Sequence, residues 1–206
     1  MNSELDEGTV LPLMEAFYTI QGEGFYTGSS AYFLRIGGCD VGCHWCDVKE
    51  SWNPEIHPLT KVDKMISSIL KHPSDTVVVT GGEPLMWDMT YLTQSLKIKG
   101  LKTHLETSGT NELSGEWDWI CLSPKKFQKP LETIKPLADE LKIIVKNKSD
   151  FKWAEQQRVG VSEKCKLYLQ PEWSNKEDMV QLIIDYVMKN PEWKISLQTH
   201  KYLQIP

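Results

Sequence analysis

Extended segments and helical patterns alternate along most of this chain, and this alternation constrains the fold more than any other feature of the sequence. Alternating strands and helices are typical of a parallel sheet with helices on its face. The segments rich in β-branched and aromatic residues, which we expect to form strands, are Tyr32–Ile36, Thr76–Thr80, Lys102–Glu106, Trp119–Ser123, Leu141–Val145, Lys166–Gln170 and Lys194–Gln198.

Three segments have the i, i+3, i+4, i+7 spacing of apolar residues that indicates an amphipathic helix. They cover residues 60–71, 85–99 and 175–189. We expect Thr60 to cap the first helix at its N-terminus, with Asp63 three residues further on. Gly100 is expected to end the second helix, and the third should end before Pro191.

The connections after Glu106 and after Ser123 contain Gly and Pro where a crossover helix would otherwise lie. The chain has 206 residues, fewer than the roughly 250 of a complete (β/α)₈ barrel. We therefore predict an α/β fold with an incomplete TIM-like barrel of six or seven mostly parallel strands and few helices, forming a single domain over residues 1–206. A doubly wound open sheet is the alternative, although the G-x-G-x-x-G dinucleotide fingerprint is absent.

Almost every expected strand runs directly into a polar loop that contains Gly or Pro. The carboxyl ends of parallel strands share one edge of a sheet or barrel, and binding sites are built there. We expect one pocket at that edge, formed by the loops Gly37-Gly38-Cys39, Gly81-Gly82-Glu83-Pro84, Thr107-Ser108-Gly109, Pro124-Lys125, Pro171-Glu172 and Thr199-His200-Lys201.

Charge and apolar content argue against nucleic acid and membranes. The chain has 23 Lys and Arg against 28 Asp and Glu, a formal net charge of −5, whereas nucleic-acid binding normally requires a basic face. Its longest apolar runs, such as 77–79, are far shorter than the roughly 20 residues of a membrane span. The N-terminal residues are acidic, unlike a signal peptide. We expect a cytoplasmic protein.

Three of the five cysteines lie close together, as Cys39-x3-Cys43-x2-Cys46. Three thiolates on one loop can hold three corners of a cubane iron–sulfur cluster. A closed structural zinc site needs a fourth ligand. If no fourth protein ligand reaches the iron–sulfur cluster, one iron keeps an open coordination position for a small molecule.

The alternative interpretation is a zinc site completed by His44, Cys121 or Cys165. His44 is next to Cys43, an awkward position for ligating the same ion. The other two cysteines lie within expected strands, where buried cysteine is common. The spacing favours the open cluster.

The cysteine spacing, with Trp45 directly before the last cysteine, resembles the signature loop of the radical S-adenosylmethionine (SAM) enzymes. The loop also follows the first expected barrel strand, as theirs does. Gly81-Gly82-Glu83-Pro84 after the next strand resembles their Gly-Gly-Glu-Pro motif. The resemblance implies that SAM binds the unique iron of a 4Fe-4S cluster and is cleaved reductively to a 5′-deoxyadenosyl radical.

Within that superfamily the chain is similar, from about residue 14 to residue 206, to the 7-carboxy-7-deazaguanine synthases. The similarity implies conversion of 6-carboxy-5,6,7,8-tetrahydropterin to 7-carboxy-7-deazaguanine with loss of ammonia, on the route to queuosine. It also implies a homodimer and an external, flavodoxin-like electron donor. The motifs that carry it are Ile20-Gln21-Gly22-Glu23-Gly24, Arg35 to Cys46, Cys46-Asp47, Glu106-Thr107-Ser108-Gly109, Ser123-Pro124-Lys125, Leu169-Gln170-Pro171 and Leu197-Gln198-Thr199-His200-Lys201.

The resemblance also implies binding residues, and several of them suit their ligands chemically. Gln21 can donate to and accept from a flat pterin edge, and Arg35 could grip a carboxylate with two hydrogen bonds. Pro206 would reach the substrate through its carboxylate. Expected substrate-binding residues are Ile20, Gln21, Gly22, Arg35, Thr80 and Pro206; expected SAM-binding residues are Trp45, Cys46, Asp47, Gly82, Glu83, Glu106, Ser123, Pro124, Lys125 and Gln170.

Several of these residues also have a plainer interpretation. Residues 20–24 could be a glycine turn that ends a hairpin, and Arg35 could form a surface salt bridge. Thr80 could be an ordinary strand residue, Glu106 could cap a helix, and Pro206 could belong to a frayed terminus.

One position departs from the family pattern. The residue after Cys-Asp is commonly Thr or Ser, whose hydroxyl ligates Mg²⁺, whereas here it is Val48. A valine side chain has no oxygen for a hard cation. We expect Mg²⁺ to be held by substrate, water and a neighbouring oxygen such as that of Asp47, or the metal dependence to be altered.

Two other functions use some of the same residues. A glycyl-radical-enzyme activase shares the cysteine spacing but would need a broad docking surface for a protein substrate. A non-catalytic zinc or iron–sulfur binding module would need a fourth protein ligand and no Gly-Gly-Glu-Pro loop.

Overall fold

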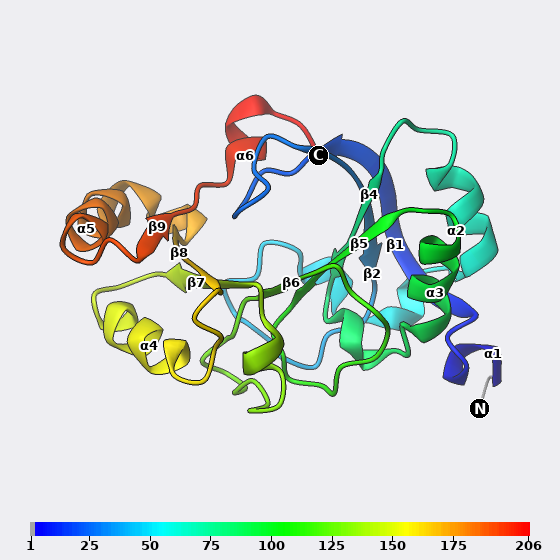
Figure 1. Cartoon of the computed structure of the whole chain (residues 1–206), viewed down its shortest axis with the longest axis horizontal. Helices are drawn as coiled ribbons and strands as arrows, with labels where there is room; N and C mark the ends of the chain where they lie inside the picture. The colour runs from blue at the N-terminus through cyan, green and yellow to red at the C-terminus, as the bar shows by residue number, and fades with distance from the viewer. Residues whose placement is uncertain (1–2) are drawn as a thin grey trace.

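A nine-stranded sheet forms the centre of the molecule in the computed structural model, which describes residues 3–206 (Figure 1). Its strand order is β3-β1-β2-β4-β5-β6-β7-β8-β9. The strands are β1 Val10–Ile20, β2 Ser30–Ile36, β3 Leu59–Lys61, β4 Thr76–Gly81, β5 Lys102–Thr107, β6 Trp119–Leu122, β7 Glu140–Val145, β8 Lys166–Pro171 and β9 Trp193–Ile195.

The strands from β2 to β9 in this order are parallel, and β1 and β3 extend the sheet in antiparallel fashion. Parallel neighbours follow the chain order without reversal, so the sheet is wound in one direction. Over the described residues, β3 and β9 stay unpaired with each other, and the sheet is open. The prediction of an incomplete, mostly parallel barrel is confirmed: seven strands form the parallel part, and β1 and β3 bring the sheet to nine rather than the expected six or seven. The doubly wound alternative is wrong.

The sheet curves, and its two faces differ in polarity. On β7, Leu141, Ile143 and Val145 belong to the larger apolar core, whereas Lys142 and Ile144 line a pocket. Successive side chains of a strand point to opposite faces, so the helix-covered face is apolar and the concave face carries polar groups. The same alternation places Phe33, Arg35, Thr80, Glu106 and Gln170 on the concave face, where they line the pocket.

Helices pack on the apolar face, in two groups (Figure 1). Apolar residues of α2 and α3 form one core with β1, β2 and β4, and those of α4 and α5 form the other with β7, β8 and β9. The helices are α1 Ser3–Asp6, α2 Val62–Ile69, α3 Thr90–Ile98, α4 Ser149–Arg158, α5 Lys176–Lys189 and α6 Thr199–Leu203, with 3₁₀ turns η1 Lys49–Ser51, η2 Pro54–Ile56, η3 Pro84–Met86, η4 Lys135–Leu137 and η5 Trp173–Asn175.

The three expected helices are present, with corrected beginnings. Thr60 does not cap α2, because it pairs with Leu11 in the short strand β3 and the helix begins at Val62. The second helix begins at Thr90 rather than Leu85, since Pro84–Met86 forms a separate 3₁₀ turn. Gly100 follows α3 with a φ of +74°, as expected of a C-terminal glycine.

Five elements carry too weak a pattern to be expected from the sequence: α1, β1, β3, α4 and α6. In α4, only Asp150 and Ala154 are buried, so the helix has no apolar stripe. The last expected strand, Lys194–Gln198, ends at Ile195. No helix in the described part of the chain is long and apolar enough to cross a bilayer.

Two segments fill the open side of the barrel. We call residues 21–29, between β1 and β2, the hairpin loop, and residues 196–206, after β9, the closing segment. The amide of Thr199 donates to the carbonyl of Gly22 at 2.9 Å, and the amide of Gly24 donates to Oγ of Ser196 at 2.9 Å. The loop therefore lies beside α6, joining the two ends of the open barrel (Figure 1).

Candidate active site

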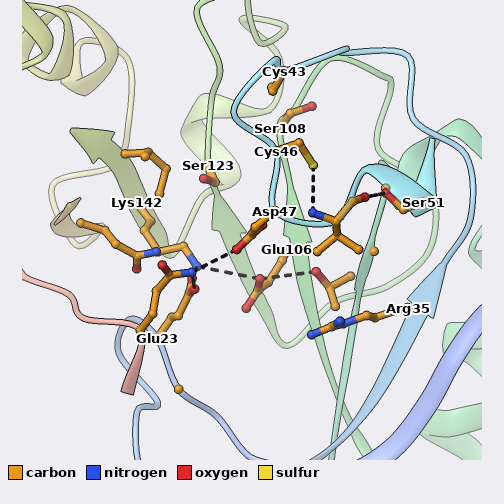
Figure 2. A pocket seen from close by; sticks show the side chains of 18 of the residues that line it. Glu23, Arg35, Cys43, Cys46, Asp47, Ser51, Glu106, Ser108, Ser123 and Lys142 are labelled. Atoms are coloured by element: carbon orange, nitrogen blue, oxygen red, sulfur yellow. Dashed lines mark hydrogen bonds and ion pairs between the residues drawn. The ribbon is translucent and has the colours of Figure 1, made fainter. Parts of the chain in front are cut away.

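A pocket with a cavity volume of about 260 Å³ opens on the concave face, where the loops after the parallel strands meet (Figure 2). All but one of the binding and ligating residues expected from the sequence line it, and the exception is Pro124. Those that line it are Ile20, Gln21, Gly22, Arg35, Cys39, Cys43, Trp45, Cys46, Asp47, Val48, Thr80, Gly82, Glu83, Glu106, Ser123, Lys125, Gln170 and Pro206.

The cysteine loop, residues 37–52, is held mainly through its backbone. Gly38 donates to the carbonyl of Ser51 at 2.6 Å and accepts from the amide of Glu83 at 2.8 Å. A Cβ added at Gly82 would lie 2.0 Å from the Gly38 carbonyl oxygen. Glycine at position 82 therefore permits the close contact between the cysteine loop and the Gly-Gly-Glu-Pro loop.

The three clustered thiols line the same pocket. Burial raises the pKa of Cys39, and it raises the pKa of Cys43 to about 11 although Lys125 lies nearby. Thiols ligate metals only after losing their protons, so binding iron here would release protons. Three soft sulfur donors on one pocket-facing loop fit an iron–sulfur cluster.

The three residues considered as a fourth ligand lie elsewhere. Cys121 is buried in β6 beside Glu140 and lines a second, small cavity, and Cys165 is buried in the apolar core. The ring of His44 packs edge-on against Phe127, with centroids 5.0 Å apart. Among residues 3–206, no group of three or more His, Cys, Asp or Glu side chains is arranged to hold a single metal ion.

Glu83 joins the Gly-Gly-Glu-Pro loop to the end of β5. Its carboxylate is buried and accepts hydrogen bonds from Oγ1 of Thr107 at 2.6 Å, the amide of Ser108 at 2.8 Å and the amide of Leu85 at 3.1 Å. Hydrogen bonds to a carboxylate are stronger than neutral ones. Glu83 therefore fixes the second motif loop of the pocket.

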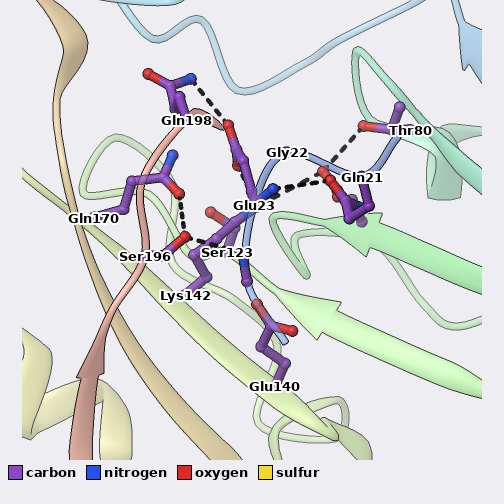
Figure 3. Close-up of polar contacts among 12 residues, drawn as sticks. Gln21, Gly22, Glu23, Thr80, Ser123, Glu140, Lys142, Gln170, Ser196 and Gln198 are labelled. Carbon is purple, nitrogen blue, oxygen red and sulfur yellow. Dashed lines mark hydrogen bonds and ion pairs between the residues drawn. The ribbon is translucent and has the colours of Figure 1, made fainter. Parts of the chain in front are cut away.

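A cluster of ionised side chains lies at the base of the pocket (Figures 2 and 3). Nζ of Lys142 lies 2.5 Å from Oε2 of Glu23 and 3.8 Å from Oε2 of Glu106. Burial raises the pKa of Glu23, but attraction to Lys142 outweighs this effect and brings the pKa to about 2. Burial lowers the pKa of Lys142, but Glu106 and Glu23 raise it well above its ordinary value. The pair is therefore ionised.

Two of the expected substrate-binding side chains contact Glu106. Nε2 of Gln21 donates to Oε1 at 3.0 Å, and Oγ1 of Thr80 donates to Oε2 at 3.4 Å. Glu106 was expected to bind SAM, and its carboxylate accepts hydrogen bonds from Gln21 and Thr80 within the protein. Arg35 lines the pocket, and its guanidinium lies 3.0 Å from the carboxylate of Glu15, the salt bridge of its plainer interpretation.

The position that departs from the family pattern offers little to a cation. The carbonyl oxygen of Val48 accepts a hydrogen bond from Oγ of Ser51 at 2.7 Å. Oδ2 of Asp47, the expected substitute ligand, lies 2.7 Å from Nζ of Lys201. An ammonium group already neutralises that carboxylate, and these residues do not fit a protein-bound Mg²⁺.

Several pocket residues were missed as site residues in the sequence analysis. Glu23, Lys142, Trp173, Gln198 and His200 line the pocket. The signal for Lys142 was present: Glu140 and Lys142 occupy alternate positions of an otherwise apolar strand in a parallel sheet. Such strands are normally apolar on both faces, so a charged alternate row indicates a lined cavity.

Comparisons with known proteins agree with this geometry. The model of the radical SAM superfamily matches residues 34–147. The 7-carboxy-7-deazaguanine synthase of Flavobacterium psychrophilum is 59% identical over 98% of this chain and 96% of its own length. The enzyme of the same name from Synechocystis is 46% identical over 94% and 93%.

A solved structure extends the similarity to three dimensions. The crystal structure of QueE from Escherichia coli superimposes with a TM-score of 0.83 at 29% identity, covering 96% of this chain and 97% of the other. The region that matches the radical SAM model, residues 34–147, contains the cysteine loop, the Gly-Gly-Glu-Pro loop and the concave-face residues of β7. The chain belongs to the 7-carboxy-7-deazaguanine synthase family of the radical SAM superfamily.

Proposed function

We propose that this protein converts 6-carboxy-5,6,7,8-tetrahydropterin into 7-carboxy-7-deazaguanine, with loss of ammonia. The observation that carries the proposal is one pocket lined both by Cys39, Cys43 and Cys46 and by the hairpin-loop residues Gln21 and Gly22. A radical enzyme needs its cofactor and its substrate within one shielded cavity. Family membership supplies the identity of the reaction.

On the cofactor side of the pocket, the three cysteines would hold a 4Fe-4S cluster. When bound, the cluster and SAM together supply an electron and a 5′-deoxyadenosyl radical that abstracts a hydrogen atom. The residues proposed to hold SAM are those expected from the sequence: Trp45, Cys46, Asp47, Gly82, Glu83, Glu106, Ser123, Pro124, Lys125 and Gln170.

On the substrate side, the pocket offers groups that suit a pterin. The backbone of Ile20, Gln21 and Gly22 would read the flat edge of donors and acceptors, and Thr80 would add a hydroxyl. The guanidinium of Arg35, whose side chain is 27% exposed, would bind the substrate carboxylate in competition with Glu15. Pro206 would contact the substrate at the mouth of the pocket.

The proposed reaction takes no step through Mg²⁺. Val48 has no side-chain oxygen, and Asp47 is paired with Lys201, so the chain supplies no good ligand at this position. The proposal includes a homodimer and an external, flavodoxin-like electron donor, both on the basis of the family resemblance alone.

A product assay tests the function. Anaerobically reconstituted protein, given reductant, SAM and the carboxylated tetrahydropterin, should release 7-carboxy-7-deazaguanine, detected by mass spectrometry. SAM cleavage without this product would favour the activase alternative. Stoichiometric zinc in place of iron would favour the non-catalytic binding module.

A further inference from the structure

Lys142 is a buried charge that no motif marks. Its side chain is 4% exposed, and it projects from β7 to the base of the pocket between Glu23 and Glu106 (Figure 2). We call these three residues the latch. They come from three separate parts of the chain: the hairpin loop, β5 and β7.

Separating Glu23 from Lys142 is energetically unfavourable for both residues. A buried ammonium group without a carboxylate partner is strongly destabilising. The ammonium of Lys142 has two carboxylates within 4 Å, at 2.5 and 3.8 Å, whereas the carboxylate of Glu23 also accepts from Nε2 of Gln198 at 2.9 Å. Swinging the hairpin loop outward would leave Lys142 with Glu106 alone.

The latch acts on both sides of Gly22. Glu23 follows this glycine and pairs with Lys142, and Gln21 precedes it and donates to Glu106 (Figure 3). The carbonyl of Gly22 accepts from the amide of Thr199 at 2.9 Å. The backbone from residue 20 to residue 22 is therefore held from three directions, although it belongs to an irregular loop.

We propose that Lys142 is a positioning residue that holds the hairpin loop across the barrel opening, so that residues 20–22 present a fixed backbone to the substrate. The inference rests on the proposed function for the identity of the substrate. The predicted change in exchange of the hairpin loop does not rest on that function, because the latch contacts lie within the protein itself.

The first test is amide hydrogen exchange of the reconstituted protein. In Lys142→Met, which removes the charge and keeps an unbranched side chain only one atom shorter, we expect the amides of Gly24 and Phe25 to exchange at least about tenfold faster. Amides within β8 should be unchanged. Lys135→Met is the matched control, because Lys135 is also buried and pairs with a single carboxylate, Glu132, at 2.9 Å.

The second test is kinetic and separates positioning from stability. Lys142→Met should raise KM for the carboxylated tetrahydropterin at least about tenfold, with a smaller change in kcat and an unchanged iron content. A variant that is merely less stable would lose iron and active protein together, with KM for the pterin unaltered.

Glu23→Gln keeps the inference testable if Lys142→Met does not fold. It retains the size of Glu23 and should show the same two changes. Unchanged exchange at Gly24 and Phe25 in a folded variant would overturn the inference. If the wild type makes no deazaguanine but the exchange result holds, the proposed function fails and the latch stands.

Discussion

The cysteine loop and the hairpin loop border the same pocket but are held by different kinds of contact. The cysteine loop is joined to the Gly-Gly-Glu-Pro loop by backbone hydrogen bonds, such as that from Glu83 to Gly38 at 2.8 Å, and its distant ion pair, Asp47 with Lys201, involves a carboxylate that is 55% exposed. The hairpin loop depends on side chains more than 100 positions away in the sequence, including Lys142 at 2.5 Å from Glu23.

This difference explains why one loop is readable from the sequence and the other is not. Spacing and glycines encode a loop that is shaped by its own backbone, so the cysteine loop has a local signature. The hairpin loop is positioned by hydrogen bonds to side chains distant in the sequence, those of Glu140 and Ser196. Three substitutions and one deletion test whether the two loops differ in this way.

The largest expected effect belongs to the cysteine loop. Cys43→Ala should lose the cluster, from about four irons per chain to almost none, and all deazaguanine production, with an unchanged circular dichroism spectrum. Iron analysis of the reconstituted protein gives the measurement. Cys165→Ala, in the apolar core, is the control and should retain its iron; equal loss in both variants would contradict the assignment.

The next effect concerns the contact between the hairpin loop and α6. A Cβ at Gly22 would lie 2.2 Å from Nδ1 of His200, so Gly22→Ala must push the two apart. Because displacement by about 1 Å can cost 100-fold, we expect kcat/KM for the pterin to fall about 100-fold, without loss of iron.

Gly28→Ala is its control within the same loop. No atom lies within 4 Å of an added Cβ there, although the φ of +91° makes the substitution locally strained. Its effect on kcat/KM should be much smaller than that of Gly22→Ala. Equal effects would mean that general strain of the loop, and not the contact with His200, controls the site.

Removal of Pro206 should have a smaller effect. This residue lines the pocket, and losing one contact of ordinary strength changes affinity about tenfold. We therefore expect KM for the pterin to rise about tenfold, with iron content and SAM cleavage unchanged. An unaltered KM would exclude residue 206 from substrate binding.

The smallest effect is a dependence of stability on pH beneath the hairpin loop. The ring of His104 lies 4.5 Å from that of Tyr26, and burial lowers the pKa of His104 from 6.5 to about 4. Between these two pH values His104 is protonated in the unfolded chain but not in the folded chain. The free energy of unfolding should therefore fall as the pH drops from 6.5 to about 4.

Urea unfolding at several pH values measures this dependence. His104→Phe keeps the aromatic contact and should flatten the curve by at most about 1.4 kcal/mol per pH unit. Glu23→Gln should leave the slope above pH 4.5 unchanged, because the pKa of Glu23 is lowered from 4.5 to about 2. Identical slopes for wild type and His104→Phe would assign the acid sensitivity to other groups.

Much of the fold follows from patterns within the sequence. The apolar rows of the seven expected strands and the stripes of three helices are local, and they predicted the parallel, incomplete barrel. The strand β1 was not predicted because the side chains of its C-terminal half are only partly buried. The helix α4 was not predicted because it buries little apolar surface. Thr60 was expected to be the N-cap of α2, but it pairs with Leu11 as part of strand β3.

For the site, the sequence by itself determined the chemistry: three thiolates at cluster spacing, a Gly-Gly-Glu-Pro loop and a set of polar strand ends. Only the tertiary structure decided how the pocket is closed. The latch joins Glu23, Glu106 and Lys142, which lie 83 and 36 positions apart along the chain. No local pattern encodes such a contact, because the low polarity that makes the charges attract exists only after the sheet has curved around them.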